Sequence, residues 1–313
     1  MTRTDTNLSA VRWHAGALNN GLIFRLTYHL VTHLPRAASY AIGRAGTWLA
    51  YQLMRDGTRA IVDNLRVVRP DATPRELERL ALLTYRSYAR DTIDFIRSLA
   101  MDRSEFARMI AHHESGRLED LLARRRGVLI VGGHFGNWEL GGVALRLLYG
   151  YPVTVVGKSE ASPVVGEIRR RMRESLGIET LEIGRMLETV LQMRRQLADN
   201  RIVAMLLDRH LGRDRIEVTF FGRPTAFLRT PAMIGYLSGA PLLPAFMIRR
   251  ADDRFVGAMG DPIVVDSTMP TEDAVRTATQ TFATQLEAKI RANPQLWYQF
   301  YRYWSAADSQ PRT

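Results

Sequence analysis

The sequence of 313 residues predicts an α/β fold, in which a mixed central sheet is flanked by helices and preceded by a helical N-terminal portion. Two observations predict it. From about Gly127 onward, short β-branched runs alternate with longer amphipathic stretches, which is typical of strands alternating with helices. Before that point the apolar residues recur mostly at helical spacing. We therefore expect a helical portion over residues 1–115 and an α/β domain over residues 116–313.

The N-terminal portion is expected to contain three helices joined by short connections. Thr73 is suited to the N-cap of the third, with Pro74 at its first position and Glu76 three residues after the cap. The segment Asn64-Leu65-Arg66 is expected to lie in a turn. The expected helices span residues 18–32, 38–54 and 73–99.

The α/β domain is expected to begin with a buried strand, because 128–131 is a short β-branched run that ends in glycines. The later strands and helices follow the same alternation. Strands are expected at 128–131, 153–156, 182–183, 202–207, 216–220, 242–248, 255–257 and 263–264. Helices are expected at 138–148, 163–176, 186–198, 230–237 and 271–292.

The composition excludes several classes of site and favours anionic partners. The chain has no cysteine, which excludes disulfides, zinc-thiolate sites and a cysteine nucleophile. The formal net charge is +11, which suits nucleic acid, an anionic membrane or an acidic carrier. No helix-turn-helix, zinc-finger or RNA-binding aromatic signature accompanies the charge, so we do not expect nucleic acid as a partner.

No segment of the sequence is expected to cross a membrane or to act as a signal peptide. Arginines interrupt the apolar N-terminal stretches into windows of about ten residues, whereas a spanning helix needs about 20. The longest uncharged window, 230–248, is broken by Pro231, Pro241 and Pro244. Residues 13–53 instead interleave aromatic and aliphatic residues with arginine and histidine, as in segments that lie at a lipid interface. The alternative is an ordinary amphipathic helix packed on the domain.

One polar pair follows the first strand of the α/β domain. Five residues turn a helix so that side chains lie about 140° apart, so His134 and Glu139 cannot share a helix face. We expect His134 in a loop and Asn137 at the N-cap of the next helix, with Glu139 in its first turn. Glu139 could then reach back to the imidazole and hold its tautomer, leaving the other nitrogen to take a proton. The alternative is a histidine in a polar corner of the core and a glutamate that only caps the helix.

The segment from His134 to Glu139, His-Phe-Gly-Asn-Trp-Glu, resembles the HX4(D/E) signature of glycerolipid acyltransferases. The form is that of the late lauroyl and myristoyl acyltransferases of bacterial lipid A biosynthesis. The resemblance covers roughly residues 15–305. Further segments follow in the order that this family shows: Asn64-Leu65-Arg66, Leu206-Leu207-Asp208-Arg209, Phe220-Phe221-Gly222 and the Pro244 segment.

The resemblance implies an acyltransferase that moves a fatty acyl group from an acyl carrier protein or coenzyme A thioester to a hydroxyl of a glycolipid or lysophospholipid. It implies direct transfer without an acyl-enzyme and with no cofactor or metal beyond the acyl donor. The absence of a G-x-S-x-G nucleophile elbow agrees with that expectation. In this mechanism His134 is the base that deprotonates the acceptor, and Glu139 orients it. The implied location is the cytoplasmic face of the bacterial inner membrane, as a peripheral or monotopic protein.

The substrate is expected to meet further polar and aromatic residues. Lys158 stands where the family often has arginine, and lysine offers a point charge in place of a bidentate fork. Asp208 and Arg209 are expected to position the acceptor, with a structural ion pair as the alternative. Phe221 and Arg223 are expected along an apolar channel, with an aromatic β-turn as the alternative. The full set expected to bind substrate is Asn137, Lys158, Asp208, Arg209, Phe221 and Arg223.

The geometry of a sheet gives an independent reason to group three of these residues. His134, Lys158 and Asp208 each follow the end of an expected strand, and ligands of open α/β sheets lie beyond the carboxyl ends of the strands. Backbone amides of 133–136, or basic residues opposite, could stabilise the oxyanion that forms when the thioester carbonyl is attacked.

Three other interpretations fit parts of the sequence. A thioester hydrolase would use the same base with water as its nucleophile. A basic membrane-binding or lipid-carrying protein would have a vestigial HX4E segment. A metal hydrolase is disfavoured, because neither an HExxH motif nor a second histidine cluster is present. The aromatic tail, 297–304, suggests either an interfacial belt or a segment packed on the core.

Overall fold

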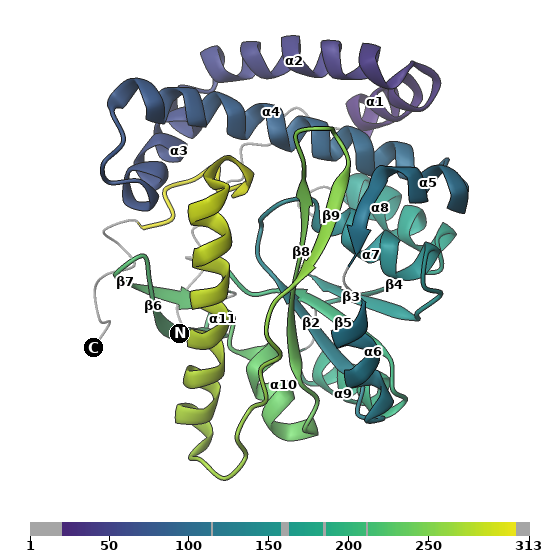
Figure 1. The fold of residues 1–313 in the computed structure, drawn as a ribbon, viewed down its shortest axis with the longest axis vertical. Coiled ribbons are helices and arrows are strands. Elements are labelled where there is room, and N and C mark those ends of the chain that lie inside the picture. The colour runs from purple at the N-terminus through teal and green to yellow at the C-terminus, as the bar shows by residue number, and fades with distance from the viewer. Residues whose placement is uncertain (1–20, 114, 158–162, 184–185, 211, 305–313) are drawn as a thin grey trace, which may run out of the picture.

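The computed structural model describes residues 21–113, 115–157, 163–183, 186–210 and 212–304. Its centre is a seven-stranded sheet in the order β1-β9-β8-β2-β5-β3-β4 (Figure 1). Neighbours from β8 to β4 run parallel, and β9 pairs antiparallel with β8 and parallel with β1. The strands of this sheet are β1 (Ile110–His113), β2 (Val128–Gly132), β3 (Val153–Gly157), β4 (Glu179–Glu182), β5 (Ile202–Leu206), β8 (Leu242–Arg249) and β9 (Phe255–Met259). The expected mixed sheet flanked by helices is confirmed.

Strand β2 lies in the middle of the sheet, and its sequence explains why. All five of its residues are buried, as expected for a parallel strand covered on both faces, where the apolar run is continuous instead of alternating. Strands β6 (Ile216–Phe220) and β7 (Arg223–Phe227) form a separate antiparallel hairpin. Along β6, buried and exposed residues alternate, which is the pattern of a strand with one face on the core.

Helices cover both faces of the sheet. The face toward α5 (Arg103–Met109), α6 (Gly116–Ala123) and α7 (Trp138–Leu147) carries one apolar core. The opposite face of the sheet carries the larger apolar core. The helices of this second layer are α9 (Met186–Ala198), α10 (Thr230–Ser238) and α11 (Thr271–Ala292), which a 3-10 turn at Pro294–Leu296 follows. Helix α8 (Pro163–Ser175) packs near the edge strand β4.

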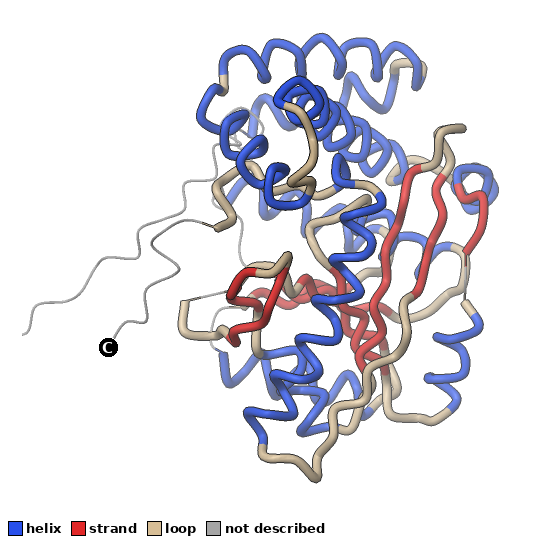
Figure 2. The backbone as a smooth tube through the Cα atoms, turned by 60° about the vertical axis from the view of Figure 1, so that its left-hand side comes forward, coloured by secondary structure: helices blue, strands red, loops and turns tan. Residues whose placement is uncertain are grey.

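The N-terminal helices form a layer at one end of the sheet, with α2 lying over α4 (Figures 1 and 2). The expected capping box at Thr73 and Glu76 is present. The turn expected at 64–66 is wrong: these residues lie within a helix whose apolar side, including Ile61 and Leu65, packs on α4. The four helices are α1 (Gly21–His33), α2 (Arg36–Leu53), α3 (Arg55–Val68) and α4 (Pro74–Ser98).

Several short elements differ from expectation. The sequence pattern did not predict α5, α6, β1 or β7. Strand β1 precedes residue 116 and yet joins the sheet beside β9. Strand β4 lies at Glu179–Glu182 in place of 182–183, and Ile263 makes only an isolated bridge to Leu242. In the part of the chain that the structure describes, no helix is both long enough and apolar enough to span a membrane.

Candidate active site

Two adjacent parallel strands bring His134 and Asp208 together. Gly132 at the end of β2 is in register with Leu206 at the end of β5, and each polar residue lies two positions further along. His134 Nδ1 lies 2.6 Å from Asp208 Oδ1, and the His134 amide donates to Asp208 Oδ2 at 3.0 Å. The expectation that polar residues converge at the carboxyl edge of the sheet is thus confirmed for this pair.

A glycine is required just before the histidine. A Cβ on Gly133 would lie 2.8 Å from a Leu286 methyl group and 3.4 Å from the Asp208 carboxyl carbon. At Gly136 the backbone has a φ of 62°, and a Cβ there would collide with the Met247 carbonyl. The glycines of this segment therefore let the loop approach both the carboxylate and strand β8.

Asp208 is a fully buried carboxylate that accepts four hydrogen bonds. Besides the two from His134, it accepts from Gln299 Nε2 at 2.8 Å and from Trp297 Nε1 at 3.3 Å. Burial raises the pKa of Asp208, but the charge and hydrogen bonds of His134, together with Arg209, outweigh it and leave this pKa below its ordinary value. Asp208 is therefore ionised at neutral pH.

An ionised Asp208 fixes the tautomer of His134. A carboxylate can only accept, so the neutral imidazole carries its proton on Nδ1 and its lone pair on Nε2. Burial lowers the pKa of His134, Arg209 lowers it further, and Asp208 opposes both without reversing the direction. The ring keeps 19% of its surface exposed, and Trp138 packs against its edge at 5.4 Å between centroids. This arrangement can act as a general base toward a hydroxyl.

The carboxylate that meets His134 is not the one we expected. Glu139 lies in the first turn of α7, but its side chain pairs with Arg173 of α8, Oε1 to Nη2 at 2.5 Å. Burial raises the pKa of Glu139, and the charge and hydrogen bond of Arg173 lower it by more. The interpretation that Glu139 orients the imidazole is corrected, because the parallel register places Asp208 against Nδ1 and the arginine takes up Glu139.

Asn137 holds the loop in place. Its Oδ1 accepts from Leu140 N at 3.2 Å, which confirms the expected N-cap of α7, and its Nδ2 donates to the Asp91 carbonyl at 2.9 Å. The side chain is buried and both of its polar groups bond within the protein. These contacts give Asn137 a structural role in the loop, and the substrate contact that we expected of it stays a prediction.

The backbone amides of the loop are also engaged within the protein. The amide of His134 donates to Asp208, that of Phe135 to Gly133, that of Gly136 to Leu296 and that of Asn137 to Met247. The expectation that these amides could stabilise an oxyanion is wrong for 134–136, because the tertiary fold uses each donor. The Gly133 amide and basic side chains are left as the candidates.

Arg209 follows Asp208 in the chain and bonds to the C-terminal tail. Its Nε donates to Gln299 Oε1 at 2.9 Å and its Nη2 to the Tyr298 carbonyl at 2.7 Å. Burial lowers the pKa of Arg209. The alternative of a structural ion pair between Asp208 and Arg209 does not describe these contacts, since Asp208 bonds to His134 instead.

The remaining expected residues lie on the β6–β7 hairpin or outside the described residues. Phe221 and Gly222 form the hairpin turn with φ of 51° and 73°, so the aromatic β-turn is present. The expected place of Phe221 and Arg223 along an apolar channel stays a prediction. Phe221 packs against Trp297 and Trp304. Arg223 is exposed and lies over the Trp304 ring at 5.8 Å. Lys158 lies outside the described residues.

The aromatic tail, residues 297–304, completes the site, and the motifs of the sequence did not indicate this role. Its residues Trp297, Tyr298 and Gln299 are almost fully buried, so packing on the core is correct and the interfacial belt is not. Asn64 holds the tail by donating to the Tyr301 carbonyl at 2.7 Å and accepting from the Tyr303 amide at 2.9 Å. A tail 89 residues or more from Asp208 leaves no local spacing signal, and its aromatic composition was the only hint.

A histidine held by a buried carboxylate at the strand ends of an α/β sheet is an arrangement typical of enzymes that use a general base. The sequence pattern of the bacterial lipid A biosynthesis acyltransferase family matches residues 18–306, so the chain belongs to this family. The protein is therefore an acyltransferase. A phosphatidylinositol mannoside acyltransferase of Mycolicibacterium smegmatis is 29% identical over 290 residues, covering 91% of each chain. Its counterpart from Mycobacterium tuberculosis is 29% identical over 248 residues, covering 78% of this chain and 75% of that protein. Membership in this family sets aside a non-catalytic lipid carrier.

Proposed function

We propose that this protein is a membrane-associated O-acyltransferase that moves a fatty acyl group from an acyl carrier protein or coenzyme A thioester to a hydroxyl of a glycolipid. The observation that carries the proposal is the contact between His134 Nδ1 and the buried Asp208 carboxylate at 2.6 Å. A lysophospholipid is the second acceptor class that the same chemistry would serve.

In the proposed reaction, His134 Nε2 removes the proton of the acceptor hydroxyl while its oxygen attacks the thioester carbon. The new carbon–oxygen bond gives a tetrahedral oxyanion, which collapses as the carbon–sulfur bond breaks. The thiolate leaves with the proton that the imidazole received. Asp208 stabilises the imidazolium that exists between these steps, because a carboxylate is favoured beside the charged ring.

Basic side chains near the loop are proposed to stabilise the oxyanion. Arg173 is held by Glu139, and this pair is largely buried with 16% of each side chain exposed. A guanidinium in such a setting offers strong charge-assisted donors to a developing oxyanion. In this proposal Glu139 contributes to catalysis by fixing Arg173, not by touching His134. Lys158 is a further proposed substrate contact.

A glycolipid acceptor is supported by the relatives. Both mycobacterial relatives bear the name of phosphatidylinositol mannoside acyltransferases, and the family is described by lipid A biosynthesis. Both descriptions concern acylation of sugar-bearing lipids. No cofactor beyond the acyl donor is needed for the proposed steps.

Association with an anionic membrane surface is supported by the outer side of α1 and α2. Residues 21–55 contain no aspartate or glutamate, and six large apolar side chains are exposed there, with Leu53 at 71% and Trp48 at 54%. An exposed apolar face with only basic charges suits an interfacial helix on anionic lipid. The six are Leu26, Leu30, Ile42, Trp48, Leu49 and Leu53. We propose a peripheral or monotopic protein at the cytoplasmic face of the inner membrane.

A transfer assay tests the proposal. Purified protein is given an acyl thioester and a phosphatidylinositol mannoside acceptor, and the acylated lipid is measured by mass spectrometry. His134→Ala should lower the rate by about 10²–10⁴-fold, the usual contribution of a general base. The exposed Asp199→Asn, at the end of α9, serves as the matched surface control and should keep the wild-type rate.

Two outcomes would overturn the proposal. Full transfer by His134→Ala would remove the histidine from the mechanism. Release of free fatty acid at an undiminished rate without any acceptor would instead identify a thioester hydrolase.

A further inference from the structure

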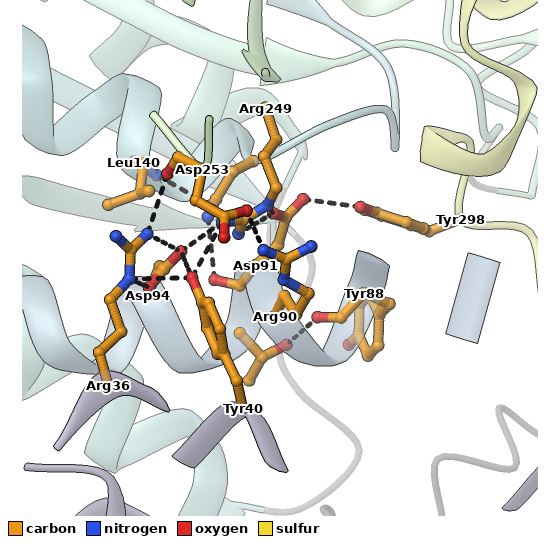
Figure 3. A network of polar contacts seen from close by, with 12 residues as sticks. Arg36, Tyr40, Tyr88, Arg90, Asp91, Asp94, Leu140, Arg249, Asp253 and Tyr298 are labelled. Atoms are coloured by element: carbon orange, nitrogen blue, oxygen red, sulfur yellow. Dashed lines mark hydrogen bonds and ion pairs between the residues drawn. The ribbon is translucent and has the colours of Figure 1, made fainter. Parts of the chain in front are cut away.

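A second buried polar cluster lies between α4 and the end of β8, away from His134. Asp91 and Asp94 project from one side of α4, and Arg249 bonds to both, at 2.6 Å and 2.7 Å (Figure 3). Arg36 and Tyr40 of α2 reach Asp94 at 2.9 Å and 2.5 Å. Two carboxylates thus face two guanidinium groups, and the charges of the cluster balance.

Only one of the two carboxylates is connected to the catalytic loop. Tyr298 donates its hydroxyl to Asp91 Oδ2 at 2.6 Å and its backbone amide to the His134 carbonyl at 2.8 Å. Tyr298 is 1% exposed, so it is a rigid link between the two. Figure 3 shows its ring extending from the cluster toward the C-terminal segment.

The backbone at residue 91 contacts the opposite end of the loop. The backbone carbonyl of Asp91 accepts a hydrogen bond from the side-chain amide of Asn137 at 2.9 Å, and Asn137 caps α7. The loop from His134 to Asn137 is therefore linked to residue 91 at both ends, through the carboxylate and Tyr298 at one end and through the backbone carbonyl at the other. Asp94, one turn along the helix, bonds instead to α2 and Arg249.

We propose that Asp91 is a positioning residue for acyl transfer, whose carboxylate sets the place of His134 through Tyr298. The proposal rests on the proposed role of His134 as the base. A base displaced by about 1 Å can lose up to 10²-fold in rate. Burial raises the pKa of Asp91, and the charge of Arg249 and the hydrogen bond from Tyr298 only partly offset this effect.

The chain offers a matched pair of variants. Asp91 and Asp94 lie on the same helix and bond to the same arginine, Arg249. Asp91→Asn and Asp94→Asn each remove one carboxylate from this arginine, so both should lower the thermal midpoint. Only Asp91→Asn should lower kcat, by about tenfold or more, with KM little changed. Tyr298→Phe removes the linking hydroxyl and keeps the buried ring, and should lower kcat in the same way. Tyr85→Phe, a buried α4 tyrosine that packs against Phe300, is its control and should keep the wild-type kcat.

A spectroscopic measurement separates positioning from general loss of structure. In protein labelled with ¹⁵N-histidine, the His134 Nδ1 proton shared with Asp208 is assigned by its loss in His134→Ala. This signal should shift in Asp91→Asn and Tyr298→Phe, and stay in place in Asp94→Asn and Tyr85→Phe. Wild-type kcat and an unmoved signal in folded Tyr298→Phe would overturn the proposal, as would equal kcat losses in Asp91→Asn and Asp94→Asn. Activity in His134→Ala would instead overturn the proposed function, and the signal would still report whether Asp91 positions the ring.

Discussion

The protein contains two buried carboxylate centres, and their surroundings differ. Asp208 is bonded by neutral donors from the tail and by a histidine, whereas Asp91 and Asp94 face two arginines. The pKa of Asp208 lies below its ordinary value and that of Asp91 above it. Because its other donors are neutral, the charge of Asp208 is available to stabilise an imidazolium. The charges of Asp91 and Asp94 are instead neutralised by arginines that join α4 to β8 and α2.

The largest effect is expected from Asp208→Asn. The asparagine side chain can donate as well as accept, so it no longer requires the imidazole to carry its proton on Nδ1. Because the tautomer is then not fixed, kcat should fall about 10²–10⁴-fold. Glu139→Gln weakens the pair that holds Arg173, the proposed oxyanion donor, and should lower kcat by about tenfold, less than the loss of a whole donor. The transfer assay measures both. A larger loss in Glu139→Gln than in Asp208→Asn would return Glu139 to the role that spacing alone suggested.

The α4 centre should respond mainly in stability. Arg249→Met leaves two carboxylates in a buried setting with reduced compensation, and should lower the free energy of unfolding by about 3–5 kcal/mol. Urea unfolding followed by circular dichroism measures it. Arg250→Met changes the next residue, which is 53% exposed, and should be close to neutral. Equal stability of the two variants would contradict the contrast between the centres.

The smallest effect concerns pH. His134 must be neutral to accept a proton, and its pKa is lowered, first by burial and then by Arg209. The plot of kcat/KM should therefore rise with pH through a limb below the ordinary histidine value of about 6.5 and be flat above it. Arg209→Gln removes a positive charge that disfavours the imidazolium, so the limb should move to higher pH. A limb that moves to lower pH, or does not move, would show that Arg209 does not govern the base.

Much of the local structure could be predicted because it is written in contiguous residues. Helices 186–198 and 271–292 and strand 216–220 match the structure at both ends, and Asn137 caps its helix as expected. Side-chain period, glycine turns and capping residues are local signals of backbone conformation. Strands β1 and β7 were not predicted, because β1 ends in two histidines and β7 contains Pro224, so neither is an uninterrupted β-branched run.

The sequence by itself determined the α/β class, the histidine in its glycine loop and the family to which the chain belongs. It could not decide which carboxylate meets the histidine. Glu139 is five positions away but lies in the first turn of a helix, where its side chain pairs with Arg173. Asp208 is 74 positions away and lies two residues beyond the end of the neighbouring strand β5. Pairing between parallel strands separated along the chain is a tertiary property, set by burial of both sheet faces. The tertiary structure therefore chose Asp208, and with it the tail that surrounds this carboxylate.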